Sequence, residues 1–123
     1  MNELNLLTEA IIGMAIEVHR QLGPGLLESI YESALCIELE QARMAFRRQH
    51  SIPIAYKGRT IGDLRPDLVV DDKVVLEIKS VDRFDPIFEA QVLTYLKVTQ
   101  RKLGLLINFN QRLLVDGIKR YIL

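Results

Sequence analysis

Three charged residues stand inside two otherwise apolar stretches near the middle of the chain. Asp67, Glu77 and Lys79 lie within residues 65–80, which otherwise resemble two apolar strands. Ionised side chains are rarely kept unpaired in the core of a strand, because removing them from water costs several kcal/mol. Charges retained at such positions point to a metal ion or to a reaction. Two carboxylates and one ammonium group suit metal-assisted hydrolysis.

The spacing of these residues places a condition on the turn between the strands. Glu77 and Lys79 are two residues apart, so both side chains project from one face of a strand. A regular two-residue loop would put Asp67 opposite Leu76, on the wrong face. The hypothesis therefore requires an odd-length loop, such as residues 71–73, or a β-bulge.

Given that register, each group has a chemical role. Asp67 and Glu77 are hard oxygen ligands for Mg²⁺ or Mn²⁺, and the main-chain carbonyl of Ile78 is a candidate further ligand. Lys79 would orient or deprotonate the attacking water and stabilise charge that develops on a phosphate. The alternative is a surface strand in which Lys79 forms an ion pair with Glu77 and has no catalytic role.

Two further pairs share helix faces. Glu28 and Tyr31 are three residues apart. Glu28 is either a first-turn glutamate favoured by the helix dipole or a third carboxylate of the metal site. Gln91 and Tyr95 are four residues apart, and this spacing alone indicates a helix surface with a half-buried tyrosine.

The pattern of apolar residues predicts the elements that position these groups. Helical spacing and breaks at Gly and Pro predict helices over residues 4–22, 26–43 and 86–99, the last with Asp85 as its cap. Strand patterns cover residues 46–56, 60–70, 73–80 and 103–108, and residues 113–123 form a strand or strand pair. The predicted order is α-α-β-β-β-α-β-β, an α/β or α+β sandwich with a mixed sheet.

Length and composition narrow the class of protein. The 123 residues fit one domain, residues 1–123, and 49% of them are hydrophobic, enough for a core without disulfides. The single cysteine excludes an intramolecular disulfide and a multi-cysteine metal site. No run is long enough to cross a membrane and no signal-peptide pattern begins the chain, so we expect a cytoplasmic protein.

Charge is balanced overall but unevenly distributed. The formal net charge is zero, which argues against strong nonspecific nucleic-acid binding. Residues 41–65 and 91–123 are mainly basic and flank the mainly acidic residues 66–90. The basic segments would grip a phosphate backbone while a cation neutralises the acidic centre. Ordinary solvated faces are the alternative reading of these charge blocks.

The motifs together resemble a known family. Pro66-Asp67, Glu77-Ile78-Lys79 and Gln91-x-x-x-Tyr95 are similar to the PD-(D/E)XK nuclease superfamily, and Gly25-x-x-Glu28-x-x-Tyr31 is similar to the signature of its GxxExxY family. The resemblance implies a restriction-endonuclease-like core with a mixed four-stranded sheet flanked by helices. It implies a catalytic set of Asp67, Glu77 and Lys79, with Glu28 as the helical acidic residue and with Gln91, Tyr95 and Tyr31 at the substrate.

Two functions follow as expectations. The first is a metal-dependent phosphodiesterase that acts on nucleic acid, with DNA as the expected substrate. The second is a non-catalytic module that retains the fold and binds nucleic acid or a protein. Since so small a chain has little spare surface for selecting a substrate, we also expect a homodimer or a protein partner.

Overall fold

The computed structural model describes residues 2–123 and contains three α-helices, seven strands and one 3₁₀-helix in that part of the chain. In chain order these are α1 (Glu3–Leu22), α2 (Glu28–Gln41), β1 (Phe46–Arg48), β2 (Ile52–Tyr56), β3 (Arg59–Leu64), β4 (Leu68–Val70), β5 (Val74–Lys79), α3 (Pro86–Thr99), β6 (Leu103–Asn108), η1 (Leu114–Gly117) and β7 (Ile118–Ile122).

Five of the strands form one mixed sheet, in the order β1-β4-β5-β6-β7. Neighbouring strands are antiparallel except for β5 and β6, which are parallel and joined through α3. A helical crossover is the usual connection between parallel neighbours, because the chain leaves one strand at the opposite end from where it must enter the next. The remaining strands, β2 and β3, form a separate antiparallel hairpin.

Local sequence accounts for where the helices begin and end. The Asn2 side chain accepts a hydrogen bond from the Asn5 amide, 2.8 Å away, and so caps α1. The helix ends at Gly23, whose φ of 72° is costly for residues with a Cβ. Asp85 caps α3 and Pro86 occupies its first turn, as predicted.

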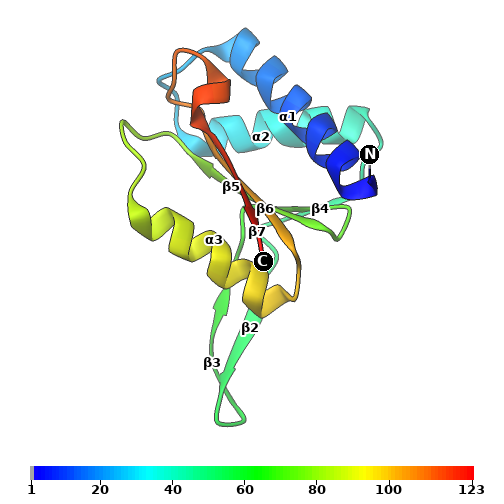
Figure 1. Ribbon diagram of the computed structural model, residues 1–123, viewed down its shortest axis with the longest axis vertical. Helices are drawn as coiled ribbons and strands as arrows, with labels where there is room; N and C mark the ends of the chain where they lie inside the picture. The colour runs from blue at the N-terminus through cyan, green and yellow to red at the C-terminus, as the bar shows by residue number, and fades with distance from the viewer. Residues whose placement is uncertain (1) are drawn as a thin grey trace.

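The helices cover both faces of the sheet. Figure 1 shows α1 and α2 on one side and α3 on the other. Leu76 and Ile78 of β5 pack in the cluster that includes the buried residues of α1 and α2, whereas Val75 packs with Val92 and Leu96 of α3. β6 is buried along its whole length because it lies between the two layers. In residues 2–123, no helix combines the length and the apolar character that a membrane span requires.

The structure corrects the predicted order α-α-β-β-β-α-β-β. Residues 46–56 form two strands, because the chain turns at Gln49, where φ is 52°. Residues 60–70 also divide, with Arg65-Pro66-Asp67 between β3 and β4. The central sheet consequently has five strands where the resemblance implied four.

Two element boundaries also differ from the prediction. The second helix is shorter than the predicted 26–43, because Leu27 is extended and residues beyond Gln41 turn away. Residues 113–123 were expected to form a strand or strand pair, but the 3₁₀-helix η1 precedes β7 there. The fold class itself, a mixed sheet flanked by helices, is confirmed.

Candidate functional site

The loop between β4 and β5 has the odd length that the site requires. Val70 pairs with Val74, which leaves Asp71-Asp72-Lys73 as the loop, and Leu68 pairs with Leu76. Asp71 and Asp72 take up the turn with φ values of 52° and 55°. Continuing this register by one residue brings Asp67 opposite Glu77, so the predicted condition on the turn is met.

Asp67 and Glu77 are joined through the backbone that carries them. The Asp67 amide donates a hydrogen bond to Glu77 Oε1, 3.0 Å away. The Ile78 amide donates to Asp67 Oδ2 at 2.7 Å. Glu77 is 5% exposed and Asp67 is half-buried. Each carboxylate is therefore fixed by a main-chain donor next to the other carboxylate.

Burial raises the pKa of both acids. Loss of solvent is the largest cause of the rise in the Glu77 pKa to about 8, and the charge of Asp67 adds to it. Loss of solvent also raises the pKa of Asp67 to about 6, and the charge of Glu32 adds to this rise. Lys79 lowers both pKa values but does not cancel the effect. Burial therefore outweighs the positive charge of Lys79 at both carboxyls.

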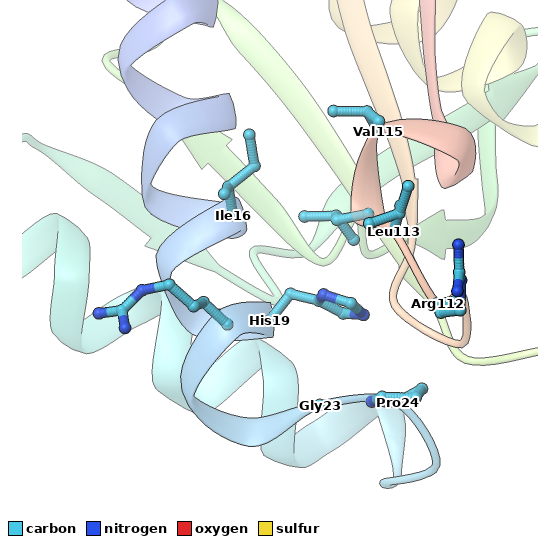
Figure 2. Close-up of a pocket in the computed structure, with 9 residues that line it drawn as sticks. Ile16, His19, Gly23, Pro24, Arg112, Leu113 and Val115 are labelled. Carbon is cyan, nitrogen blue, oxygen red and sulfur yellow. The ribbon is translucent and has the colours of Figure 1, made fainter.

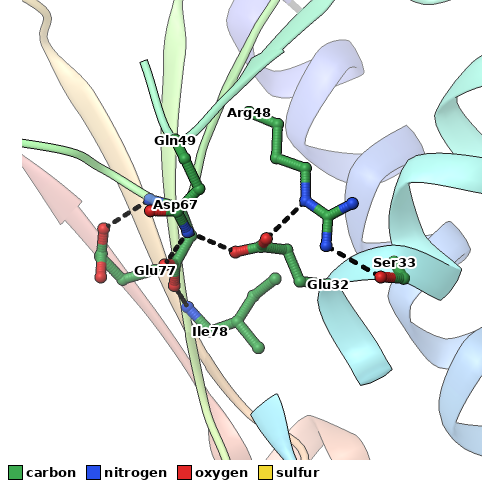
Figure 3. A network of polar contacts seen from close by, with 7 residues as sticks. All are labelled: Glu32, Ser33, Arg48, Gln49, Asp67, Glu77 and Ile78. Atoms are coloured by element: carbon green, nitrogen blue, oxygen red, sulfur yellow. Dashed lines mark hydrogen bonds and ion pairs between the residues drawn. The ribbon is translucent and has the colours of Figure 1, made fainter. Parts of the chain in front are cut away.

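A polar network holds Asp67 from the side of α2, as Figure 3 shows. The Gln49 side-chain nitrogen donates to Asp67 Oδ1 at 3.0 Å and to Glu32 Oε1 at 2.9 Å. Arg48 Nε donates to Glu32 Oε2 at 2.6 Å, and Arg48 Nη2 donates to Ser33 Oγ at 2.8 Å. Glu32 is buried and ion-paired, and it fixes Gln49 against Asp67.

Sequence reasoning missed Glu32, Arg48 and Gln49. One signal for Glu32 was available, because it lies four residues after Glu28 and thus on the same face of α2. Gln49 and Arg48 carried no such signal. Arg48 is the last residue of β1 and Gln49 follows it, so the pairing of β1 with β4 sets the position of both.

Lys79 and the residues of α3 lie on the same side of the sheet. Val75, two residues before Glu77, packs against α3, so Glu77 and Lys79 also face that helix. Lys79 Nζ is 4.5 Å from the ring centroid of Phe88 on α3, a cation–π contact. Lys79 thus contacts an aromatic ring, whereas the alternative interpretation placed it in a surface ion pair with Glu77.

The charges of the two carboxylates act on the Tyr95 hydroxyl. Loss of solvent raises the pKa of the Tyr95 hydroxyl, and the charges of Glu77 and Asp67 add to the rise. Gln91 is exposed one turn earlier on α3. The roles of Tyr95 and Gln91 at the substrate stay predictions.

Glu28 lies just beyond the end of β5. Glu28 Oε2 accepts a hydrogen bond from the Ser80 amide at 3.0 Å. The two residues line a cavity of about 410 Å³ together with Leu26, Leu27 and Ser29. Since Ser80 directly follows Lys79, this cavity opens next to the charged end of β5.

Tyr31 does not lie at a substrate surface. Its side chain is 0% exposed and stacks on Phe109, with 4.5 Å between ring centroids. Its hydroxyl donates to the Gly23 carbonyl at 2.6 Å and accepts from the Leu26 amide at 3.1 Å. The prediction that Tyr31 contacts substrate is wrong, because its oxygen is engaged in holding the loop between α1 and α2.

The acidic pair fits a divalent cation. Asp67 and Glu77 offer the hard oxygen ligands that Mg²⁺ and Mn²⁺ prefer, in a place where burial disfavours their unpaired negative charge. Among residues 2–123, no third His, Cys, Asp or Glu joins them in a group that could hold a metal ion, and this includes Glu28. Mg²⁺ usually retains several waters, so two carboxylates are compatible with it. The Ile78 carbonyl stays a predicted ligand.

A different hollow, drawn in Figure 2, lies between the end of α1 and η1. It has a volume of about 410 Å³, and its walls include Ile16, Leu113 and Val115. His19 Nε2 donates to the Gln111 carbonyl at 2.7 Å and so joins these two segments. None of the residues that line it belongs to the predicted catalytic set.

Comparison with known proteins gives one match. A family model described as the PD-(D/E)XK nuclease superfamily matches residues 5–121, almost the whole chain. No curated protein and no solved structure matches the chain. The matched segment includes Asp67, Glu77 and Lys79 together with both helical layers.

Proposed function

We propose that the chain hydrolyses phosphodiester bonds of nucleic acid with the help of a divalent cation, because it belongs to the PD-(D/E)XK nuclease superfamily. The observation that carries the proposal is the pair of neighbouring carboxylates: Glu77 accepts a hydrogen bond from the Asp67 amide, and Asp67 accepts one from the Ile78 amide. Gly25, Glu28 and Tyr31 support the further proposal that it belongs to the GxxExxY branch.

Asp67 and Glu77 would hold Mg²⁺ or Mn²⁺. When bound, such an ion polarises a phosphoryl oxygen and lowers the pKa of a bound water. The two carboxylates would fix the position of the cation, and Gln49 keeps Asp67 in place through its hydrogen bond. Main-chain and side-chain donors that are already in position need no rearrangement during the reaction.

Lys79 supplies the positive charge next to the pair. Its ammonium group, held over the Phe88 ring, would stabilise the charge that develops on the phosphate during attack by water. Water adds to the phosphorus as the bond to the leaving oxygen breaks, and the leaving oxygen gains a proton. Glu28 lines the cavity beside Ser80, where it would orient water or, through water, a substrate phosphate group.

A cleavage assay tests this proposal. We expect the wild type to cleave nucleic acid in Mg²⁺ or Mn²⁺, with DNA proposed first, when single- and double-stranded DNA and RNA are tested in parallel. Asp67→Asn and Lys79→Ala should each lower kcat by about 100-fold or more, since a charged group at the reacting centre is lost. Asp71→Asn, in the same hairpin but on the surface, is the matched control and should retain activity.

Equal cleavage by the wild type, Asp67→Asn and Lys79→Ala would mean that a contaminant is responsible, and the proposal would fall. Binding of nucleic acid or of a protein without any cleavage would favour the non-catalytic module.

A further inference from the structure

The hairpin of β2 and β3 extends away from the body of the molecule, as Figure 1 shows. It is inserted between β1 and β4, and neither of its strands pairs with the five-stranded sheet. The chain enters it after Gln49 and leaves it before Asp67. Both of these residues belong to the network around the acidic pair. The hairpin, residues 52–64, is called the arm below.

Packing in the hydrophobic core does not account for the presence of the arm. In the described chain, no residue from 47 to 67 belongs to either hydrophobic cluster. Most of the arm is exposed, including Tyr56 at 60% and Ile61 at 67%. An isolated two-stranded hairpin is only marginally stable in water. An element that contributes so little to the core is better explained by something that it contacts.

Local interactions nevertheless shape the arm. Lys57 and Gly58 form its tip with φ values of 49° and 78°, the pair of positive values that a type I′ turn requires. Ser51 Oγ donates to Asp63 Oδ2 at 2.5 Å, and Arg65 Nε donates to the same oxygen at 3.0 Å. Six residues of extended chain span about 20 Å, so the tip lies roughly that far from the base.

The charge of the arm and its base is positive. Lys57 and Arg59 are exposed on either side of the tip, and Lys57 Nζ is 5.5 Å from the centroid of the Tyr56 ring. Arg47 lies exposed at the base. Asp63 is the one acidic residue between 46 and 66, and it is already paired with Arg65. The cations at the tip have no acidic partner among residues 2–123.

We infer that the arm binds a nucleic-acid duplex beside the phosphate that is cleaved, an inference that rests on the proposed function. A two-stranded β-ribbon fits the major groove of B-form DNA, and its cations can contact the phosphates along the groove. A reach of about 20 Å corresponds to about six base pairs at 3.4 Å each. The arm therefore contacts the duplex about half a turn from the acidic pair, and its attachment at Gln49 and Asp67 fixes that offset.

Equilibrium binding to a labelled 20-base-pair duplex DNA tests the inference. Binding is measured in EDTA over a range of salt concentrations, so that no cleavage intervenes, and cleavage in Mg²⁺ is measured separately. The test variant is Lys57→Ala/Arg59→Ala. The control, Arg20→Ala/Arg83→Ala, removes two exposed cations outside both basic segments and causes the same change in net charge. Thermal unfolding confirms that each variant is folded.

Loss of two phosphate contacts should lower the slope of log affinity against log salt by about 2 and weaken binding on the order of 50-fold at 0.1 M salt. Tyr56→Ala should weaken binding with no change of slope, because it carries no charge. The control should bind like the wild type. Light scattering on the same proteins reports the oligomeric state.

Four results would overturn the inference. The first two are that the wild type does not bind the duplex and that the test variant binds it as tightly as the wild type. The others are that the test and control variants lose equal affinity, or that the test variant loses a dimer while its duplex affinity stays intact. The last result would assign the arm to a contact between copies. These results are separate from those of the cleavage assay. If the protein cleaves no nucleic acid but its duplex affinity depends on the arm, the proposed hydrolysis is wrong and the role of the arm stands.

Discussion

The carboxyl of Glu77 lies where an ionised group is costly, on the buried face of β5 and beside Asp67. Its main-chain partner, the Asp67 amide, does not offset the loss of water, so the pKa rises to about 8. A cation bound between the two acids would reverse this effect. The same residue is therefore a source of instability without metal and a ligand with it.

The stability of the metal-free protein should fall as pH rises. The folded pKa of Glu77, about 8, lies above its ordinary value of 4.5, so the folded protein holds a proton that the unfolded chain has released. The free energy of unfolding therefore decreases between about pH 4.5 and pH 8, by on the order of 5 kcal/mol, because each pH unit between the two pKa values contributes about 1.4 kcal/mol. Urea unfolding in EDTA across this range measures the decrease. Glu77→Gln should flatten the dependence, and an equally steep dependence in that variant would contradict the assignment.

Gln49 should be needed to position Asp67. In Gln49→Ala, Asp67 and Glu32 lose the amide group that lies between them, and their negative charges then repel without a shared donor. We expect kcat/KM to fall about tenfold or more and the metal concentration for half-maximal activity to rise. Gln41→Ala, at the exposed end of α2, is the control. Unchanged metal dependence in Gln49→Ala would remove its positioning role.

Tyr31 should matter for stability and not for chemistry. Tyr31→Phe leaves the Leu26 amide and the Gly23 carbonyl without their hydroxyl partner, at a cost of about 1–3 kcal/mol. Denaturant unfolding measures that cost, and activity per folded molecule should be unchanged. A specific loss of activity with no loss of stability would restore Tyr31 to the substrate site.

At this scale, Asp67, Glu77 and Lys79 could be singled out as candidates from sequence because charge in an apolar strand is locally visible. Tyr31 could not be placed correctly, since its spacing from Glu28 does not reveal that Phe109 covers it. Gln49 could not be found, because its contact with Asp67 is made across two strands that pair only in the folded chain.

The loop between β4 and β5 is the element that sets the site. Its three residues fix the register, and the first two adopt positive φ values that Asp tolerates better than most residues. Arg101 bonds the Asp72 side chain and accounts in part for the shape of the loop. The sequence shows that the loop must have an odd number of residues, whereas the number itself, three, is known only from the strand pairing in the structure.

Deleting Asp72 should therefore preserve the site, because the register depends on the pairing of Val70 with Val74. A two-residue loop of Asp71 and Lys73 keeps that pairing and leaves Asp67 opposite Glu77. We expect a folded but destabilised protein that still cleaves nucleic acid and binds Mn²⁺. A circular dichroism spectrum checks the fold. Loss of both cleavage and Mn²⁺ binding in the folded deletion variant would show that the register alone does not position the pair.

Long elements were predictable and short ones were not. Periodic burial over twenty residues identifies α1, and the fully apolar β6 is equally clear in the sequence. Four strands have only three to six residues each, and the sequence pattern does not separate them. It predicts one strand in place of β1 and β2 and one in place of β3 and β4. No local pattern marks where the arm leaves the sheet.

Over the whole molecule, the sheet separates two hydrophobic clusters and carries the acidic pair on its α3 side. α2 covers the other face, yet its Glu32 reaches the pair through Gln49. The site thus draws on both layers and on the base of the arm. Changes that loosen either layer are expected to affect it.

A titration with Mn²⁺, followed by electron paramagnetic resonance, tests most directly that Asp67 and Glu77 together hold a divalent cation. The account predicts saturable binding by the wild type that tightens from pH 6 to pH 8.5, because the cation displaces the proton of Glu77. Asp67→Asn and Glu77→Gln should each weaken it at least about tenfold, while Asp71→Asn should not. Equal affinity in all four proteins, or no saturable binding by the wild type, would contradict the account.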